Sequence, residues 1–355
     1  MKAAVCRTFG EPLVIEDVQL ARPRKGEVSV RVRAVGVCHS DLTFMDGRWG
    51  GDLPAVYGHE VAGEVTAAGT GVTGVRVGDH VAVTLVRTCG RCFFCARGEP
   101  TQCEGSFAID SRGALKTRRG GRLVQGLRVG GFAEHVTVHE SQAVRIPRSV
   151  PMTSACLLSC AVATGVGAVR NTARVPSGAS VAVVGAGGVG INSIQAAALA
   201  GARPVVAIDP SPSRQRAARR FGATHAMGPE RADAVRRLTR RGADFAIVTS
   251  GNPAAVELGL AVVRRAGTVV IVGMTASDET VAVNPGDIAD AAIRILGCKL
   301  GAIRPHVDIP ELVNLYAAGR LKLDGLVSAT FPLECINDAI AATRRGDGLR
   351  NVVVM

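Results

Sequence analysis

The sequence predicts a mixed α/β protein in which a β-rich region is followed by a doubly wound parallel sheet. Three observations support this fold class. The chain has 355 residues, which fits two domains of roughly 100–200 residues each. Short segments with alternating apolar residues fill its first part. After Pro151, short apolar runs alternate with helical stretches, as in parallel sheets covered by helices.

The β-rich region extends from residue 1 to about residue 150. Residues 28–36 alternate with a period of two, as expected for a half-buried strand. Similar segments at 61–69 and 79–83 follow, separated by glycine-rich turns. Several short strands connected in this way indicate a barrel or a sandwich.

The second part of the chain has the sequence pattern of buried parallel strands and their crossover helices. Its strands are predicted at 180–185, 204–209, 245–249 and 268–273, and its first two helices at 187–200 and 213–221. We find no internal repeat and no low-complexity linker, so one doubly wound sheet accounts for this region.

A glycine-rich motif connects the first of these strands to its helix. Gly185, Gly187 and Gly190 form G-x-G-x-x-G, with Gly188 and Val189 inside it. The first glycine permits a tight turn, the second lets the backbone approach a pyrophosphate, and the third lets helix and strand pack closely. The free N–H groups at the start of the helix would bind the phosphates.

Asp209 ends the next strand, where a carboxylate would accept hydrogen bonds from the adenosine ribose. Because a carboxylate repels a 2′-phosphate, the sequence favours NAD over NADP, although Arg214 lies close enough to influence that choice.

Composition limits the possible partners. The net charge of +12 is compatible with nucleic acid, but the basic residues are scattered and their local clusters lack aromatic residues for base stacking. No apolar stretch of about 18 residues is present, and the first residues lack the apolar run expected of a signal peptide. We therefore expect a cytoplasmic protein with a small-molecule substrate and without nucleic-acid or membrane partners.

Four of the ten cysteines are close together in the sequence. Cys89, Cys92, Cys95 and Cys103 have the spacing C-x2-C-x2-C-x7-C, which favours a closed tetrahedral zinc site of structural type. An iron–sulfur cluster, or free or disulfide-linked cysteines, are the alternatives.

Three further motifs are Cys38-His39-Ser40-Asp41, Gly58-His59-Glu60 and Cys160 in an apolar run. With the four-cysteine segment and the glycine motif, and in this order, they resemble the zinc-containing medium-chain alcohol dehydrogenase family. The resemblance covers essentially the whole chain. It implies a GroES-like catalytic domain made of residues 1–160 and 298–355, with a zinc lobe at about 87–104, and a Rossmann NAD-binding domain at 161–297.

The resemblance also implies roles for individual residues. A catalytic zinc with one open position would be held by Cys38, His59 and Cys160. Ser40 would transfer the substrate proton, Asp41 would orient the ring of His59, and Glu60 would approach the zinc during ligand exchange. Contacts with the cofactor are implied for His39 and Arg350 at the pyrophosphate and Thr164 at the nicotinamide. Trp49 and Leu85 match positions that line the substrate pocket.

Two segments depart from the pattern or remain open. Many family members end the proton relay on a histidine three residues after the serine, whereas this chain has Thr43, which cannot act as a base. The proton would then leave through the ribose and water, or through His39. Residues 106–130, rich in arginine and glycine, are expected to form a loop near the pocket mouth.

The function implied is a reversible hydride transfer between a primary or secondary alcohol and NAD, with two zinc ions per chain. A redox-neutral epimerase, a polyol or sugar dehydrogenase, a glutathione-dependent formaldehyde dehydrogenase and a non-catalytic nucleic-acid-binding zinc protein are alternatives. The family commonly forms homodimers or homotetramers by pairing sheet edges, for which we expect strands near 268–273 and 281–283.

Overall fold

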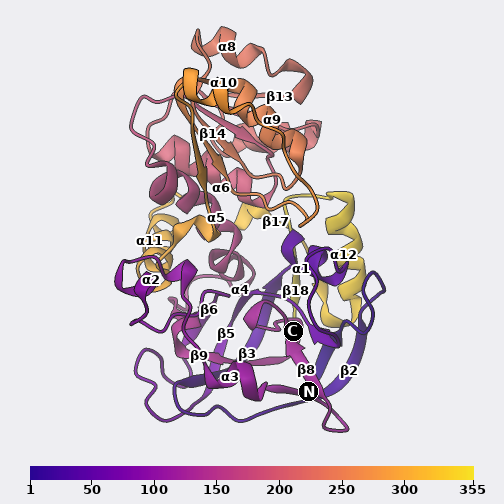
Figure 1. The fold of residues 1–355 in the computed structure, drawn as a ribbon. Helices are drawn as coiled ribbons and strands as arrows, with labels where there is room; N and C mark the ends of the chain where they lie inside the picture. The colour runs from indigo at the N-terminus through magenta and orange to yellow at the C-terminus, as the bar shows by residue number, and fades with distance from the viewer. The chain divides into compact units, whose positions relative to one another are not determined.

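The computed structural model describes all 355 residues, and they divide into two compact units (Figure 1). Unit 1 contains Met1–Cys160 and Arg304–Met355, and unit 2 contains Ala161–Ile303. The chain therefore leaves unit 1 once and returns to it for its last 52 residues.

Unit 1 is rich in strands. Its strands are β1 (Lys2–Val5), β2 (Val14–Leu20), β3 (Glu27–Gly36), β4 (Ala55–Val56), β5 (Glu60–Ala68), β6 (His80–Val83), β7 (Leu115–Thr117), β8 (Arg122–Gln125), β9 (His135–His139), β10 (Ala143–Arg145), β17 (Val327–Pro332) and β18 (Arg350–Val354). Its helices are α1 (His39–Met45), α2 (Phe93–Ala96), α3 (Ala108–Arg112), α4 (Met152–Ala155), α11 (Pro305–Ala317) and α12 (Ile336–Arg345), with 3₁₀ turns η1 (Pro100–Gln102), η2 (Gly126–Arg128), η3 (Glu140–Gln142), η4 (Cys156–Ser159), η8 (Asp324–Leu326) and η9 (Leu333–Cys335).

Strand β3 is the centre of unit 1. The predicted alternation holds only in the middle of the strand, where Val30 and Val32 are buried while Arg31 and Arg33 are exposed. Towards both ends, at Ser29 and at Ala34–Gly36, both faces of the strand are buried. β3 pairs with β5, β9 and β18 in a sheet of order β10-β6-β5-β3-β18-β17, and a second sheet has the order β1-β2-β7-β8-β4. The C-terminal strand thus completes the sheet that the N-terminal segment begins.

The prediction that residues 106–130 form a loop is wrong. This segment contains α3, β7 and β8, and β7 pairs with β2 while β8 pairs with β7 and β4. The turn between β7 and β8 is made at Gly120, where φ is +88°, so glycine marks a hairpin here. The segment therefore belongs to the second sheet of unit 1.

Unit 2 alternates strands and helices. Its strands are β11 (Val181–Val184), β12 (Val205–Ile208), β13 (His225–Met227), β14 (Ala243–Val248), β15 (Val263–Ile271) and β16 (Arg294–Gly297). Its helices are α5 (Ala161–Gly167), α6 (Gly188–Leu199), α7 (Pro212–Arg220), α8 (Ala234–Thr239), α9 (Pro253–Val262) and α10 (Pro285–Asp290), with the π-helical turn η5 (Ala168–Ala173) and the 3₁₀ turns η6 (Pro229–Arg231) and η7 (Leu300–Ala302).

The predicted doubly wound sheet is confirmed. All six strands are parallel, in the order β13-β12-β11-β14-β15-β16. The expected edge strands are wrong, however. Residues 268–271 lie in β15, which has a partner on each side, and 281–283 form no strand, so β16 is the edge on this side of the sheet and β13 is the opposite edge.

The end of unit 2 differs from the expected boundary at residue 298. Residues 298–303 still pack within unit 2, where the carbonyl oxygen of Gly301 accepts a hydrogen bond from Asn171 Nδ2 at 3.1 Å. The backbones approach so closely that a Cβ on Gly167 would lie 2.1 Å from that oxygen. This contact holds the chain in unit 2 until Ile303.

No single helix has the length and the apolar composition of a membrane span. The helices Met152–Ser159 and Ala161–Ala173 have that length and composition only when they are counted together, and they are bent relative to each other.

Candidate functional site

Four potential metal ligands meet in the interior of unit 1. The ligand atoms of Cys38, His59, Glu60 and Cys160 all lie within 4.8 Å of one another, and all four residues are buried. Cys38 is the N-cap of α1, Glu60 begins β5 directly after His59, and Cys160 is the C-cap of η4. The three ligands expected for the catalytic zinc are therefore brought together with Glu60.

Strand pairing explains this convergence. β3 and β5 are antiparallel, and Gly36 at the end of β3 pairs with Glu60 at the start of β5. A side chain at position 36 would collide with Glu60, because its Cβ would lie 2.3 Å from Glu60 Oε2. Thr84 Oγ1 donates to the carbonyl oxygen of Ser159 at 2.9 Å, which fixes the backbone just before Cys160.

Asp41 holds two of these segments together. Its Oδ1 accepts hydrogen bonds from the Gly58 amide at 2.9 Å and lies 3.0 Å from His59 Nδ1, and its Oδ2 accepts from the Cys38 amide at 3.3 Å. The carboxylate is fully buried. This contact occupies Nδ1 and leaves Nε2 as the ring nitrogen available to a metal ion.

We expect Asp41→Asn to weaken zinc binding by about 10–100-fold, the range found when the group behind a ligating histidine is removed. The asparagine can still accept from Gly58, but its NH2 group cannot accept from Cys38 and the negative charge is lost. Zinc retained against increasing chelator measures the effect. Asp46→Asn, at the exposed end of the same helix where Asp46 pairs with Arg344, is the control and should retain zinc as the parent does.

Polar atoms in this cluster lack protein partners. His59 Nε2 and both carboxylate oxygens of Glu60 are buried without a hydrogen bond, although Arg350 Nη2 lies 3.4 Å from Glu60 Oε1 as an ion pair. Buried unsatisfied groups are costly and call for a ligand. Two thiols and an imidazole nitrogen are donors that zinc prefers, so the residues present fit that ion.

Burial and neighbouring charges shift the pKa values of the cluster. The adjacent Cys160 thiol lowers the pKa of Cys38, against the effect of burial. Burial lowers the pKa of His59, but Asp41 and Cys38 outweigh it and the net shift is upward. Burial raises the pKa of Glu60 to about 7, although Arg350 acts in the opposite direction.

The four cysteines of the lobe form a second cluster. The Sγ atoms of Cys89, Cys92, Cys95 and Cys103 lie within 4.8 Å of one another, and all four thiols are free. Backbone N–H groups point at the sulfurs, and those of Cys95 and Glu104 lower the pKa of Cys92 to about 6. Four converging thiols without an open position fit a structural zinc.

Arg87 anchors this lobe, and sequence analysis missed it. Its guanidinium is buried, donates to Gln142 Oε1 at 2.7 Å and to the Arg128 carbonyl oxygen at 3.1 Å, and forms an ion pair with Asp110. Gln142 Nε2 donates in turn to the Thr84 carbonyl oxygen at 3.0 Å. Only its position just before Cys89 could have indicated a role.

We expect Arg87→Met to lower the free energy of unfolding of unit 1 by about 3 kcal/mol, because it removes two buried charge-assisted hydrogen bonds, to Gln142 Oε1 and to the Arg128 carbonyl oxygen. Each acceptor keeps one other hydrogen bond, from the His139 amide and from Gln142 Nε2. Asp110 is half exposed and can be hydrated, which limits the loss. Denaturant unfolding measures this effect. Arg145→Met removes an exposed ion pair with Asp79 and should change stability by less than about 1 kcal/mol.

The glycine motif of unit 2 has the geometry of a phosphate-binding turn. Gly185 has φ of +91°, which favours glycine, and a Cβ on Gly190 would lie 1.8 Å from the Gly185 carbonyl oxygen. Gly187 is the N-cap of α6, and Gly188 and Val189 lie in the first turn of this helix. A Cβ on Gly187 would meet nothing within 4 Å. The space beside Gly187 fits a phosphate group.

Asp209 and Arg214 lie next to this turn. Asp209 Oδ2 accepts from the Ala186 amide at 2.7 Å and Oδ1 from the Ser211 amide at 2.9 Å, while Arg214 Nη1 is 3.9 Å from Oδ2. The carboxylate therefore also braces the glycine turn. Thr164 Oγ1, in α5, is buried without a hydrogen-bond partner and can serve a bound ligand.

The residues of unit 1 for which a role in proton transfer or in the substrate pocket was expected lie in or near α1, except Leu85. His39 and Ser40 are the first residues of α1, and Ser40 Oγ is 3.9 Å from Cys38 Sγ. Thr43 Oγ1 donates to the His39 carbonyl oxygen at 2.9 Å, a contact within the helix. Trp49 and Leu85 are partly buried.

Arg350 begins β18, and its Nη1 donates to the Val37 carbonyl oxygen at 3.4 Å. Its pairing with Glu60 was not expected, because it depends on β18 returning beside β3.

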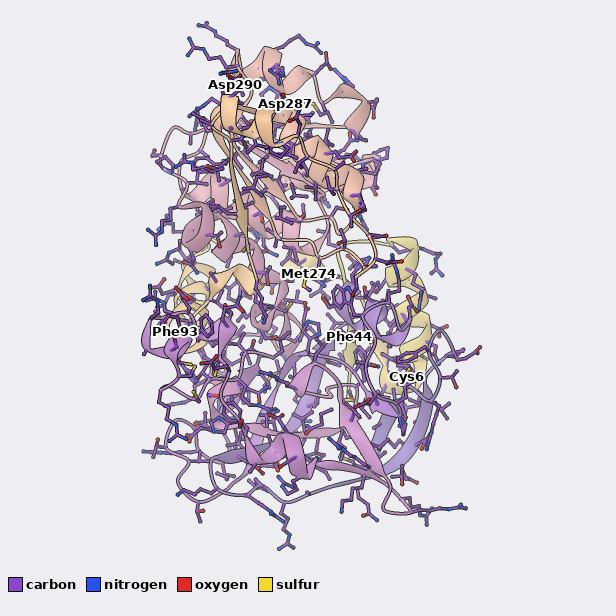
Figure 2. The ribbon with its side chains drawn as sticks, in the orientation of Figure 1. Cys6, Phe44, Phe93, Met274, Asp287 and Asp290 are labelled. Atoms are coloured by element: carbon purple, nitrogen blue, oxygen red, sulfur yellow. The ribbon has the colours of Figure 1, made fainter.

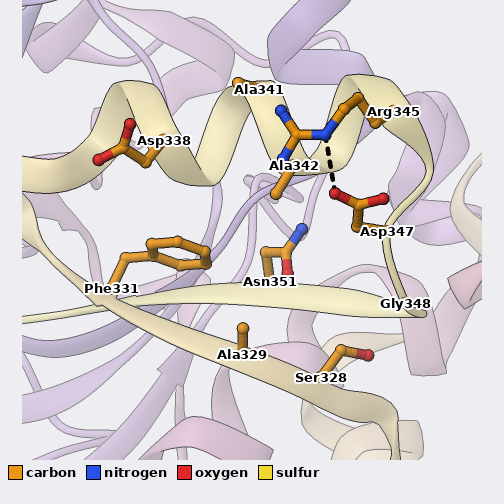
Figure 3. Close-up of a pocket in the computed structure, with 10 residues that line it drawn as sticks. All are labelled: Ser328, Ala329, Phe331, Asp338, Ala341, Ala342, Arg345, Asp347, Gly348 and Asn351. Atoms are coloured by element: carbon orange, nitrogen blue, oxygen red, sulfur yellow. Dashed lines mark hydrogen bonds and ion pairs between the residues drawn. The ribbon is translucent and has the colours of Figure 1, made fainter.

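A cavity of about 530 Å³ lies on another part of unit 1, between α12 and strands β17 and β18 (Figure 3). None of the four clustered ligands lines it.

Comparison with known proteins identifies the family. Residues 24–148 match the alcohol dehydrogenase GroES-like domain, and residues 188–318 match the zinc-binding dehydrogenase domain. An NDMA-dependent alcohol dehydrogenase from Amycolatopsis methanolica is 36% identical over 99% of this chain and 98% of its own. The chain belongs to the zinc-containing medium-chain alcohol dehydrogenase family.

Solved structures agree with this assignment. An alcohol dehydrogenase zinc-binding domain protein from Burkholderia ambifaria has a TM-score of 0.94 and 36% identity, over 100% of this chain and 98% of that one. Benzyl alcohol dehydrogenase from Acinetobacter calcoaceticus has a TM-score of 0.94 and 31% identity, over 100% and 99%. The expected family and fold are confirmed: this zinc alcohol dehydrogenase is an oxidoreductase that acts on CH–OH groups with a nicotinamide cofactor.

Proposed function

We propose that this alcohol dehydrogenase oxidises a primary or secondary alcohol reversibly with NAD, and that it holds two zinc ions per chain. Cys38, His59 and Cys160 would hold the catalytic ion, and the four-cysteine lobe would hold a structural one. The observation that carries the proposal is His59 Nε2, which is buried and without a partner in a cluster with two thiols.

A zinc ion in the Cys38 cluster would supply Lewis acidity to the substrate oxygen, and NAD would accept the hydride. The carbinol C–H electron pair leaves as hydride, and the hydroxyl proton leaves separately, so that alcohol and NAD⁺ give carbonyl product, NADH and H⁺. Ser40 is the proposed first proton acceptor, since it begins α1 beside Cys38. Thr43 donates within the helix, so the proton would pass on to the ribose and water or to His39.

Around the ligands, Asp41 keeps the tautomer of His59 that presents Nε2. Arg350 partly compensates the buried charge of Glu60. We propose that Glu60 approaches the zinc during ligand exchange. For cofactor binding we propose His39 and Arg350 at the pyrophosphate, the glycine turn at the phosphates and Thr164 at the nicotinamide.

The proposed preference for NAD rests on Asp209, whose carboxylate would repel a 2′-phosphate. Arg214 is half-buried beside it and partly offsets that charge. We further propose a cytoplasmic homodimer or homotetramer, in which the edge strand β16 supplies the pairing surface.

The test is NADH formation by zinc-replete protein with a panel of primary, secondary, aromatic and polyol substrates, with NADP and Cys38→Ser run alongside. NADH formation that disappears in Cys38→Ser would support the proposal, and faster reduction of NADP would overturn the cofactor preference. No turnover by protein that contains two zinc ions and binds NADH would contradict a simple dehydrogenase.

A second candidate is catalysis with a retained cofactor, as in a redox-neutral epimerisation. Thr43 is consistent with it, because a redox-neutral reaction releases no net proton and does not need a relay base at this position. The name of the Amycolatopsis relative ties its activity to NDMA, so the assay should include NDMA in place of free NAD. Turnover without added NAD, by protein that retains cofactor after gel filtration, would support this candidate.

A further inference from the structure

The segment that carries Cys160 needs a support of its own. Asp41 fixes the segments of Cys38 and His59 by hydrogen bonds. Cys160 separates η4 from α5, and its φ of −142° and ψ of −74° differ from helical values. Regular helix geometry therefore does not set the direction of its side chain, and other contacts must hold the backbone at this point.

Thr84 supplies such a contact. It follows the last residue of β6, in the stretch of chain that leads to the four-cysteine lobe, whose helix α2 begins at Phe93 (Figure 2). Its Oγ1 donates to the carbonyl oxygen of Ser159, which directly precedes Cys160, at 2.9 Å. Thr84 and Ser159 are both fully buried. Ser159 Oγ donates in turn to the Cys156 carbonyl oxygen at 2.6 Å, so side chains hold η4 from β6 and from within.

Gln142 holds Thr84 in position. The Thr84 amide donates to the Gln142 carbonyl oxygen at 3.0 Å, and Gln142 Nε2 donates to the Thr84 carbonyl oxygen at 3.0 Å. Gln142 Nε2 also donates to the Arg128 carbonyl oxygen at 3.1 Å. Its Oε1 accepts from Arg87 Nε and from the His139 amide. The buried amide thus uses both of its donors and two acceptor positions, and the backbone of Thr84 is fixed at its amide and at its carbonyl group.

Packing alone does not explain a hydroxyl group at position 84. Val81, Ala82 and Val83 of β6 are fully buried and apolar. A valine after them would match the shape of Thr84 and avoid the desolvation of a hydroxyl group. The hydroxyl oxygen also accepts from the Val86 amide at 3.3 Å, which is a local contact within the loop. The contact that reaches another part of the fold is the one with η4.

We propose that Thr84 is a positioning residue for the metal cluster, and that its hydroxyl holds the Ser159 carbonyl group so that the Cys160 thiol converges with the other ligands. This inference rests on the proposed zinc site, and it adds a residue that supports a ligand instead of being one. Groups that orient metal ligands contribute about 10–100-fold to metal affinity. With valine at position 84 the Ser159 carbonyl group loses this donor, and Cys160 is free to turn away from the cluster.

Cobalt(II) provides the test, because its visible spectrum reports on the number and geometry of its ligands. The cluster metal of the holoenzyme is exchanged for cobalt, and the spectrum of Cys160→Ala treated in the same way is the background. We expect Thr84→Val to shift the thiolate-to-cobalt absorption and to weaken cobalt binding about tenfold or more. Thr84→Ser keeps the hydroxyl and should behave as the parent does. Thr84→Ala removes the same hydroxyl and should resemble Thr84→Val, so the result does not depend on the fit of valine.

Thr137→Val is the matched control. Thr137 lies fully buried in β9 of the same unit, and its Oγ1 donates to the Ala21 carbonyl oxygen at 3.2 Å and lies 2.9 Å from Ser29 Oγ. Its loss should lower stability as the loss of the Thr84 hydroxyl does, without changing the cobalt spectrum. Parent-like cobalt spectra and affinities in Thr84→Val and Thr84→Ala would make Thr84 an ordinary buried hydroxyl and overturn the proposal. Identical spectra for the parent and Cys160→Ala would instead remove the proposed zinc site, and this inference with it.

Discussion

Cys160→Ala is expected to reduce the zinc content from two ions per chain to one and to lower kcat/KM by about 10³-fold or more. The reason is the loss of one thiol from a site whose other ligands are Cys38 and His59. Lewis-acid stabilisation by a bound metal contributes several kcal/mol, and each 1.36 kcal/mol corresponds to a factor of ten in rate. Zinc is measured by atomic emission and activity by NADH formation.

Cys156→Ala is the matched control. Cys156 lies four residues earlier, is equally buried, and donates its thiol to the Thr153 carbonyl oxygen at 3.2 Å. Its removal costs a small cavity and one weak hydrogen bond, about 1 kcal/mol of stability. Both zinc ions and the activity should persist. If both variants lost zinc and activity to the same extent, Cys160 would be a packing residue and the ligand assignment would fail.

The sequence could predict features that depend on local chemistry. The glycine turn is recognisable because each glycine has a local steric reason, such as the positive φ of Gly185. The alternation at residues 30–33 follows from one face of β3 being exposed there. Parallel strands in unit 2 follow from short apolar runs between helices.

Features that depend on distant pairing could not be predicted. Residues 106–130 look like a loop because they are rich in arginine and glycine, yet β7 finds its partner in β2, about a hundred residues earlier. In the sequence, nothing distinguishes Arg87 from the other arginines. In the structure it is buried by its contacts with η2, α3 and η3. The ion pair between Arg350 and Glu60 likewise exists because β18 returns to β3. In each case the partner is chosen by tertiary packing.

Gly190→Ala is expected to destabilise unit 2 by about 2 kcal/mol or more and to abolish NADH binding. The added Cβ would lie 1.8 Å from the Gly185 carbonyl oxygen and 2.9 Å from Thr249 Oγ1. The first atom belongs to the backbone of the glycine turn, so α6 and the turn must separate to accept the methyl group. Overpacking of this kind is costly, and the separation also removes the N–H groups of α6 from the phosphate position.

Gly187→Ala separates the steric effect on the fold from the effect on the cofactor. Its φ of −73° suits alanine, and the added Cβ would meet no atom within 4 Å, so thermal unfolding should match the parent. If that space receives the pyrophosphate, the methyl group will raise the Kd for NADH by about tenfold or more. The paired result, lost stability at position 190 and lost affinity alone at 187, follows only from a phosphate-binding turn. Unchanged NADH affinity in Gly187→Ala would place the dinucleotide elsewhere in unit 2.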